Sequence, residues 1–138
     1  MVMTTNAIER DFCKNVCEKI GLVREGVNRY RVFTPFLFED GDHLAIVLKR
    51  ENDHWALSDE GHTYLHLAYD IDESDFLRGA RQKAINNALS TFRVEVRDGE
   101  LTLAIKDEQY GDALYSFVQA LLKVTDISAI WTWDEWPL

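Results

Sequence analysis

The stretch TFRVEVRDGELTLAI, residues 91–105, constrains the fold more than any other part of the chain. Apolar and polar residues alternate on both sides of Asp98-Gly99, and a period of two is typical of a strand with one buried face. Asp-Gly is a preferred pair for a two-residue hairpin turn, because both central residues of that turn need a positive φ. The chain is therefore predicted to contain an antiparallel hairpin with one face turned towards a core.

A second hairpin is predicted shortly before the first. HLAIVLKR, residues 43–50, is typical of a buried strand, and the turn residues END lead back into HWALSD, residues 54–59. Further upstream, RYRVFTPFLF (29–38) begins with strand-like alternation. Pro35 then interrupts that strand or places it at a sheet edge, because proline cannot donate a ladder hydrogen bond.

Amphipathic helices are predicted around these hairpins, from apolar residues spaced three to four apart. They cover residues 6–20, residues 60–69, a stretch from Asp72 or Ser74 to Thr91, and residues 108–124. This order of elements is typical of an α+β fold. We expect a single domain over residues 1–138, with an antiparallel sheet built from hairpins, helices packed on one face, and a Trp-rich C-terminal tail at 127–138.

The two cysteines, Cys13 and Cys17, lie four residues apart in the first predicted helix. That spacing puts them on one face and suits a disulfide poorly, because disulfide geometry is demanding. They lie beside Phe12, Val16 and Ile20, so we expect them to be small core residues. The interpretation favours a reducing compartment.

The net charge is −9 in 138 residues. An acidic surface repels phosphate, which disfavours nucleic acid and anionic membranes as broad partners and permits binding to a basic protein surface. No run approaches the roughly 20 apolar residues of a membrane span, and the N-terminus lacks the blocks of a secretory signal. We expect a soluble, cytoplasmic protein that does not bind membranes. A local basic patch remains possible, formed by Arg29, Arg31, Lys49 and Arg50.

A cluster of metal-binding residue types lies in WALSDEGHTYLHL, residues 55–67. His62 and His66 share a helix face one turn apart, the offset of two ligands for one metal, and Asp59 or His43 is a possible third ligand. HTYLH has the frame of the zinc-protease motif H-E-x-x-H, but Thr63 stands where the general-base Glu belongs. We favour a helix capped by Ser58 or Asp59 over a metal site, and expect neither metal nor cofactor.

A magnesium-dependent nuclease is the other hydrolase hypothesis. Asp42, Lys49 and Glu51 follow the order of an acidic residue at a strand end and a carboxylate with a lysine on the next strand. Asp is also common in turns for backbone reasons alone, and we favour turn chemistry as the explanation of these positions. No catalytic set is assigned. The chain has no G-x-S-x-G elbow and no Gly-rich phosphate loop.

The C-terminal tail, ISAIWTWDEWPL, holds three tryptophans in six residues. If it is extended, Trp131 and Trp133 point to the same side. Tryptophan is enriched at the centres of protein interfaces. The tail is predicted either to bind a partner or to cover the domain's own sheet. The predicted partner-binding residues are Trp131, Trp133, Asp134, Glu135 and Trp136.

Several of these motifs together resemble the bacterial family called domain of unknown function 1828. They are the Thr34-Pro35-Phe36 step, the strand entered through Asp42, the LSDEG turn into a Leu-rich helix, and the V-x-V-x-D-G-E-L hairpin. The resemblance runs from about the first helix to residue 127. It implies a protein of bacterial genomes, plasmids and prophages, with no activity or catalytic set to carry over.

Three hypotheses for the function remain. We favour a non-enzymatic acidic binding protein, a regulator or inhibitor encoded on a mobile element, which acts on a protein partner. If that partner handles nucleic acid, the negative charge would occupy its phosphate-binding track. The alternative is a metal-dependent hydrolase or nuclease that uses Asp59, His62 and His66. The third is a small DNA-binding dimer that uses Arg29 and Arg31. The sequence leaves homodimerisation open.

Overall fold

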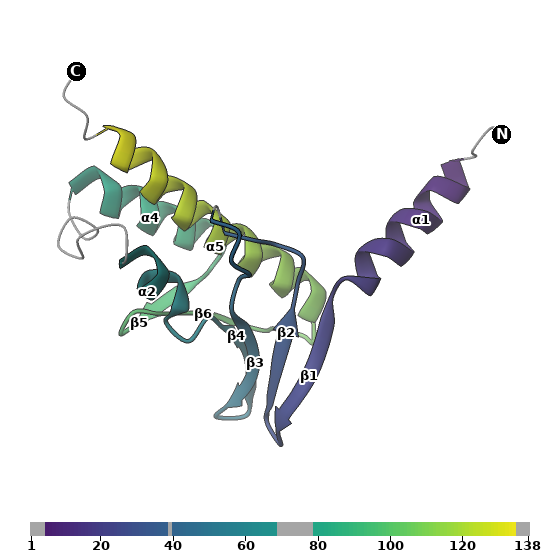
Figure 1. Ribbon diagram of the computed structural model, residues 1–138. Coiled ribbons are helices and arrows are strands. Elements are labelled where there is room, and N and C mark those ends of the chain that lie inside the picture. The colour runs from purple at the N-terminus through teal and green to yellow at the C-terminus, as the bar shows by residue number, and fades with distance from the viewer. Residues whose placement is uncertain (1–4, 39, 69–78, 135–138) are drawn as a thin grey trace.

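The structure is a computed structural model that describes residues 5–38, 40–68 and 79–134 (Figure 1). In chain order its elements are α1 (Thr5–Glu18), β1 (Gly21–Gly26), β2 (Arg29–Phe33), β3 (Ile46–Glu51), β4 (His54–Ser58), α2 (His62–Ala68), α4 (Gly79–Thr91), β5 (Glu95–Arg97), β6 (Glu100–Ala104) and α5 (Tyr110–Asp134).

The strands within the described residues form one six-stranded antiparallel sheet in the order β1-β2-β3-β4-β6-β5. Three hairpins supply the strands, and pairing of β4 with β6 joins the last hairpin to the rest. Asp98 and Gly99 have φ values of 52° and 80°, the positive values that a tight hairpin turn requires. The predicted α+β fold with a hairpin-built sheet is therefore confirmed.

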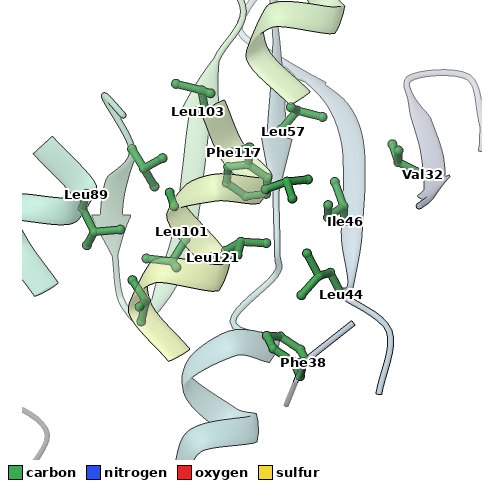
Figure 2. Close-up of a cluster of buried hydrophobic side chains, with 14 of the residues drawn as sticks. Val32, Phe38, Leu44, Ile46, Leu57, Leu89, Leu101, Leu103, Phe117 and Leu121 are labelled. Atoms are coloured by element: carbon green, nitrogen blue, oxygen red, sulfur yellow. The ribbon is translucent and has the colours of Figure 1, made fainter. Parts of the chain in front are cut away.

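The core lies between the sheet and the two long helices. Figure 1 shows α4 and α5 lying side by side along one face of the sheet. Phe117 and Leu121 of α5 are fully buried, and Leu101 of β6 lies against them in the cluster (Figure 2). Along each strand every second side chain points to this face, and Leu48 and Leu57, which are paired across β3 and β4, are two of them. Lys49 and Ser58, one residue away, consequently point to the face that α4 and α5 leave open.

The helix at the N-terminus differs from its prediction. α1 forms close to the predicted range, but no residue across Thr5–Glu18 is buried. Cys13 and Cys17 are free and exposed, so their prediction as core residues is wrong. Figure 1 shows α1 projecting away from the sheet and the other helices. The apolar spacing predicted the helix correctly, but spacing carries no information about which surface covers the apolar face.

Two further elements depart from the sequence analysis. β1 was not predicted. α5 continues ten residues past the predicted end at Val124, to Asp134. Residues 127–134 are therefore helical rather than extended. None of the helices in the described ranges is long and apolar enough to cross a membrane.

Candidate functional site

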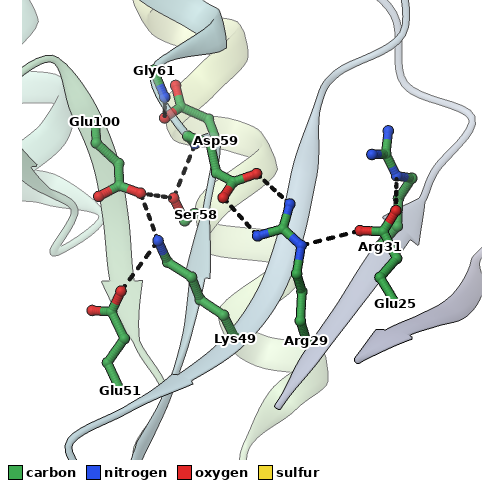
Figure 3. Close-up of polar contacts among 10 residues, drawn as sticks. Glu25, Arg29, Arg31, Lys49, Glu51, Ser58, Asp59, Gly61 and Glu100 are labelled. Atoms are coloured by element: carbon green, nitrogen blue, oxygen red, sulfur yellow. Dashed lines mark hydrogen bonds and ion pairs between the residues drawn. The ribbon is translucent and has the colours of Figure 1, made fainter. Parts of the chain in front are cut away.

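A charged network covers the open face of the sheet (Figure 3). Its side chains come from five neighbouring strands, β1, β2, β3, β4 and β6, and from the turn that leads into α2. Alternation along the strands places them opposite the core. We call this set the charged network; it consists of Glu25, Arg29, Arg31, Lys49, Glu51, Ser58, Glu60 and Glu100.

Arg29 connects one half of the network. Its two terminal nitrogens donate to the Glu60 carboxylate at 2.6 Å and 2.5 Å, and its Nε donates to Glu25 Oε1 at 3.2 Å. The hydrogen bond from Arg29 lowers the pKa of Glu60. The hydrogen bond from Arg31, together with that from Arg29, lowers the pKa of Glu25. A fork-shaped, two-point contact of this kind holds the turn before α2 over the sheet.

Lys49 connects the other half. Its Nζ lies 2.8 Å from Glu100 Oε2 and 3.2 Å from Glu51 Oε1. Ser58 Oγ donates to the same Glu100 oxygen at 2.6 Å. These contacts lower the pKa of Glu100, with the Lys49 hydrogen bond as the main cause. Burial alone would lower the pKa of Lys49, but the two carboxylates outweigh it and the pKa is raised.

The predicted basic patch is present in the sheet, but each of its cations has an acidic neighbour. Arg29, Arg31 and Lys49 share the open face and are paired with carboxylates, as above. Arg50 is 3.7 Å from Asp53. The three cations of the charged network face four carboxylates, so their combined charge is negative. Such a surface has little free positive charge with which to displace counterions from a phosphate backbone.

The hydrogen bonds that the Asp59 side chain accepts come from backbone amides and give it a structural role. Its carboxylate is 1% exposed and accepts backbone hydrogen bonds from three amides. Oδ1 accepts from Gly61 and Leu101, each at 2.9 Å, and Oδ2 accepts from Thr63 at 3.2 Å. Ser58 Oγ accepts from the Glu60 amide at 2.9 Å. The side chains of Ser58 and Asp59 thus cap the turn into α2, as predicted, and Asp59 also ties that turn to β6.

A cleft of about 370 Å³ lies beside this turn, between α2 and the segment that joins β2 to β3. It brings His43 close to His62, which lies 19 residues later in the chain. Among the described residues, however, no group of three or more His, Cys, Asp or Glu side chains is placed to hold a metal ion. The polar part of its lining is made by Arg31, Thr34, His43, Asp59, Glu60 and His62.

His66 and Glu51 are two further predicted metal ligands. His66 lies in α2, one turn after His62, and its side chain is outside the described set. Glu51 forms an ion pair with Lys49. The magnesium-site hypothesis therefore has no assembled ligand set among the residues that the structure describes.

The predicted partner-binding residues fall at the end of the described chain. The backbone of Trp131, Trp133 and Asp134 forms the last turn of α5. Glu135 and Trp136 lie outside the described residues. Their role in binding stays a prediction.

A surface that the sequence analysis missed lies on α1 and β1. Phe12 is 64% exposed and Val27, just after β1, is 76% exposed. Apolar side chains this accessible over adjoining elements are a common mark of an interaction site. The signal in the sequence was the amphipathic spacing of α1, which was interpreted as a core-facing stripe.

The sequence was also compared with known proteins. The family described as "Domain of unknown function DUF1828" matches residues 34–124. No curated protein and no solved structure matches the chain. The matched range begins at the Thr34-Pro35-Phe36 step and includes both the LSDEG turn and the Asp98-Gly99 hairpin. It leaves out α1, β1, β2 and the last ten residues of α5.

Proposed function

Because the chain belongs to the DUF1828 family, whose description assigns no function, we propose from its own residues that it is a non-enzymatic, acidic binding protein. It acts in the cytoplasm on a protein partner, as a regulator or inhibitor encoded on a mobile element. Its polar residues maintain the fold, and its surface makes the contact with the partner.

The observation that carries this proposal is that the carboxylates a hydrolase would need are already engaged in hydrogen bonds and ion pairs within the fold. The Asp59 carboxylate is engaged by three backbone amides. Glu60 is held by Arg29, and Glu100 is held by Lys49 and Ser58. A catalytic carboxylate needs a free lone pair directed at a substrate or a metal ion. Groups that are already satisfied within the fold support a structural role instead.

The charge distribution supports a basic partner. Residues 34–138 contain 9 basic and 20 acidic residues, a net charge of −11, whereas residues 1–33 contain six basic and four acidic residues, a net charge of +2. Complementary charge accelerates association and favours partners of the opposite sign. A protein that normally binds nucleic acid has such a basic surface, and the acidic part of this chain would compete for it. Trp131, Trp133 and Trp136 are the proposed apolar anchors.

Affinity capture from the host tests this proposal. The wild-type chain is compared with a variant in which Trp131, Trp133 and Trp136 are all changed to Ala. A control variant carries Tyr110→Ala and Tyr115→Ala, two exposed aromatic residues in the first part of α5. Captured proteins are identified by mass spectrometry at about 0.1 M and 1 M salt, because screening at high salt weakens contacts between exposed charges.

We expect a basic protein that is captured by the wild type and the control at low salt, lost at high salt, and lost with the tryptophan variant. Circular dichroism must show that the tryptophan variant remains folded. Loss of its fold would identify the tail as core and remove it as the anchor. Equal capture by all three proteins would also contradict the assignment.

One observation favours a second candidate, a metal-dependent hydrolase: His43 and His62 share the cleft next to Asp59. This candidate predicts cleavage of DNA or RNA in Mg²⁺ or Mn²⁺ that His62→Ala abolishes. The third candidate, a DNA-binding dimer, predicts a gel shift that Arg29→Ala and Arg31→Ala remove. We expect neither result, because the cations are paired with carboxylates and no set of three ligands is assembled in the described residues.

A further inference from the structure

α1 presents an apolar stripe that nothing in the described chain covers. Ile8, Phe12 and Val16 recur every four residues and therefore lie on one face of the helix. They are 39%, 64% and 48% exposed. In Figure 1 the helix stands clear of the sheet and of α4 and α5. Burial of such a stripe is normally what stabilises an amphipathic helix in a protein.

A helix of 14 residues is marginal in water without tertiary contacts, because nucleation is costly and each further residue adds little. α1 therefore needs a surface to pack against. We propose that this surface is a second copy of the same chain, and that α1 and β1 together form the interface of a twofold homodimer. The dimer does not depend on the partner capture proposed above.

The stripe itself is suited to self-association. Phe12 is at its centre, with Ile8 four residues before and Val16 four residues after. When two copies of α1 pack antiparallel, Phe12 meets Phe12 of the second copy and Ile8 meets Val16 in both halves of the contact. A twofold interface requires this reciprocity, in which residue i contacts j and j contacts i.

The neighbouring strand extends the same surface. β1 is an edge strand of the sheet, and all of its residues after Gly21 are exposed. An unpaired edge is a template for a strand from another chain. The exposed apolar residues in α1, in β1 and close to β1 in the sheet are Ile8, Phe12, Val16, Leu22, Val23, Val27 and Phe33. Leu22 and Val23 are adjacent in β1 and point to opposite faces of the sheet.

The size of this surface matches what a dimer needs. At these exposures the three α1 residues offer roughly 300 Å² per chain, and the four residues in and near β1 offer roughly 400 Å² more, divided between the two faces of the sheet. A contact that covers α1 and both faces of the sheet at the β1 edge would remove up to roughly 1,400 Å² from two chains, within the range of about 1,200–2,000 Å² for specific, stable interfaces.

Charge also favours a second copy at this place. Residues 5–26, which contain α1 and β1, have four basic and four acidic residues and therefore no net charge, whereas the remaining residues carry −9. Two copies that approached through their acidic parts would repel each other. Contact through α1 and β1, whose charges balance, avoids that repulsion.

Analytical ultracentrifugation tests the dimer directly. The wild-type chain, at 16.0 kDa, should sediment as a species of twice that mass at micromolar concentration. Phe12→Asp should raise the dimer dissociation constant by roughly 100-fold or more, because the change is present twice in a twofold contact. Val16→Asp should act in the same direction. The matched control is Tyr115→Asp, an aromatic residue on α5 with a similar exposure of 60%, and it should leave the dimer unchanged.

No residue of α1 is buried, so the Asp variants keep the core and should remain folded by circular dichroism. A monomeric wild type at 100 μM would overturn the proposal. A Phe12→Asp protein that dimerises like the wild type would overturn it as well, and so would a Tyr115→Asp protein that dissociates to the same degree.

The two cysteines test the antiparallel geometry. A short bis-maleimide is added to two single-cysteine variants, Cys17→Ser and Cys13→Ser. Around a twofold axis at Phe12, the two copies of Cys13 are offset by roughly 3 Å along the helices and the two copies of Cys17 by roughly 15 Å. We expect a covalent dimer from Cys17→Ser, which keeps Cys13, and little from Cys13→Ser. Equal cross-linking of both variants would contradict antiparallel packing of α1.

Discussion

Substitution of Asp59 by Ala is the sharpest test of the structural role assigned to the polar residues. Asp59 is 1% exposed and accepts hydrogen bonds from the amides of Gly61, Thr63 and Leu101. The amides of Thr63 and Leu101 belong to buried residues. Removal of the carboxylate leaves these donors unsatisfied, at a cost of about 1–3 kcal/mol for each buried donor.

The three contacts together predict a loss of about 3–5 kcal/mol in the free energy of unfolding. Domains of this kind are stable by only about 5–15 kcal/mol, so the loss is a large fraction of the total. Asp59→Asn should cost less, because one amide oxygen still accepts from Gly61 and Leu101, while the NH₂ group faces the Thr63 amide. Its expected loss is about 1–3 kcal/mol.

Urea unfolding followed by circular dichroism measures these losses by linear extrapolation. Asp126→Ala is the matched control, because Asp126 is exposed on α5 and surface substitutions usually stay within about 0.5 kcal/mol. A loss below about 1 kcal/mol for Asp59→Ala would refute the reasoning. Unchanged or increased stability is the behaviour of a functional carboxylate, which is held in place at a cost to the fold.

Three further predictions concern the same scaffold. Glu60 and Glu100 have pKa values below the ordinary 4.5 in the folded chain. The stability that their ion pairs give to the fold is present above pH 4.5 and is lost as the pH falls below it, because the unfolded chain then binds more protons than the folded chain. Thermal unfolding between pH 7 and pH 3 should show this loss, and Glu100→Gln should reduce it; an identical pH profile for Glu100→Gln would contradict the ion pair. Phe117→Ala, at a fully buried position, should cost about 3–5 kcal/mol in urea unfolding, whereas Tyr115→Ala should cost less than about 1 kcal/mol. Gly99→Ala, at φ 80°, should lower the stability by about 1 kcal/mol or more; a neutral effect would contradict the turn geometry.

The features that local chemistry determines were predictable from the sequence. The alternation around Asp98-Gly99 predicted the β5–β6 hairpin, because turn type and strand face depend on neighbouring residues. The apolar spacing over residues 108–124 predicted an amphipathic helix, and Phe117 and Leu121, both part of that spacing, are fully buried. The roles of Ser58 and Asp59 as caps also followed from the sequence, because capping acts over a few residues.

The features that depend on distant parts of the chain were not predictable. Arg29 pairs with Glu60, 31 residues away, and Lys49 pairs with Glu100, 51 residues away. Only the order of the strands in the sheet brings these groups together. The exposure of Phe12 was missed for the same reason: a helical period identifies an apolar face but not its neighbour.

β1 and the end of α5 were missed for local reasons. Leu22 and Val23 are adjacent rather than alternating, and an edge strand needs little burial on either face. Thr125 and Asp126 have low helix propensity, which made Val124 look like the last residue of α5. Thr125 instead bonds back to the carbonyl groups of Leu121 and Leu122, at 3.3 Å and 2.8 Å, within the continuing helix.

Metal content is the measurement that tests the central claim most directly. The claim is that the carboxylates and imidazoles around α2 maintain the fold, while the surface makes contact with other molecules. Wild-type chain and a His62→Ala variant are purified without chelators and analysed by mass spectrometry for zinc, manganese and magnesium. The account predicts much less than one equivalent of any of these metals in both proteins. One equivalent in the wild type that is lost in the variant would contradict it.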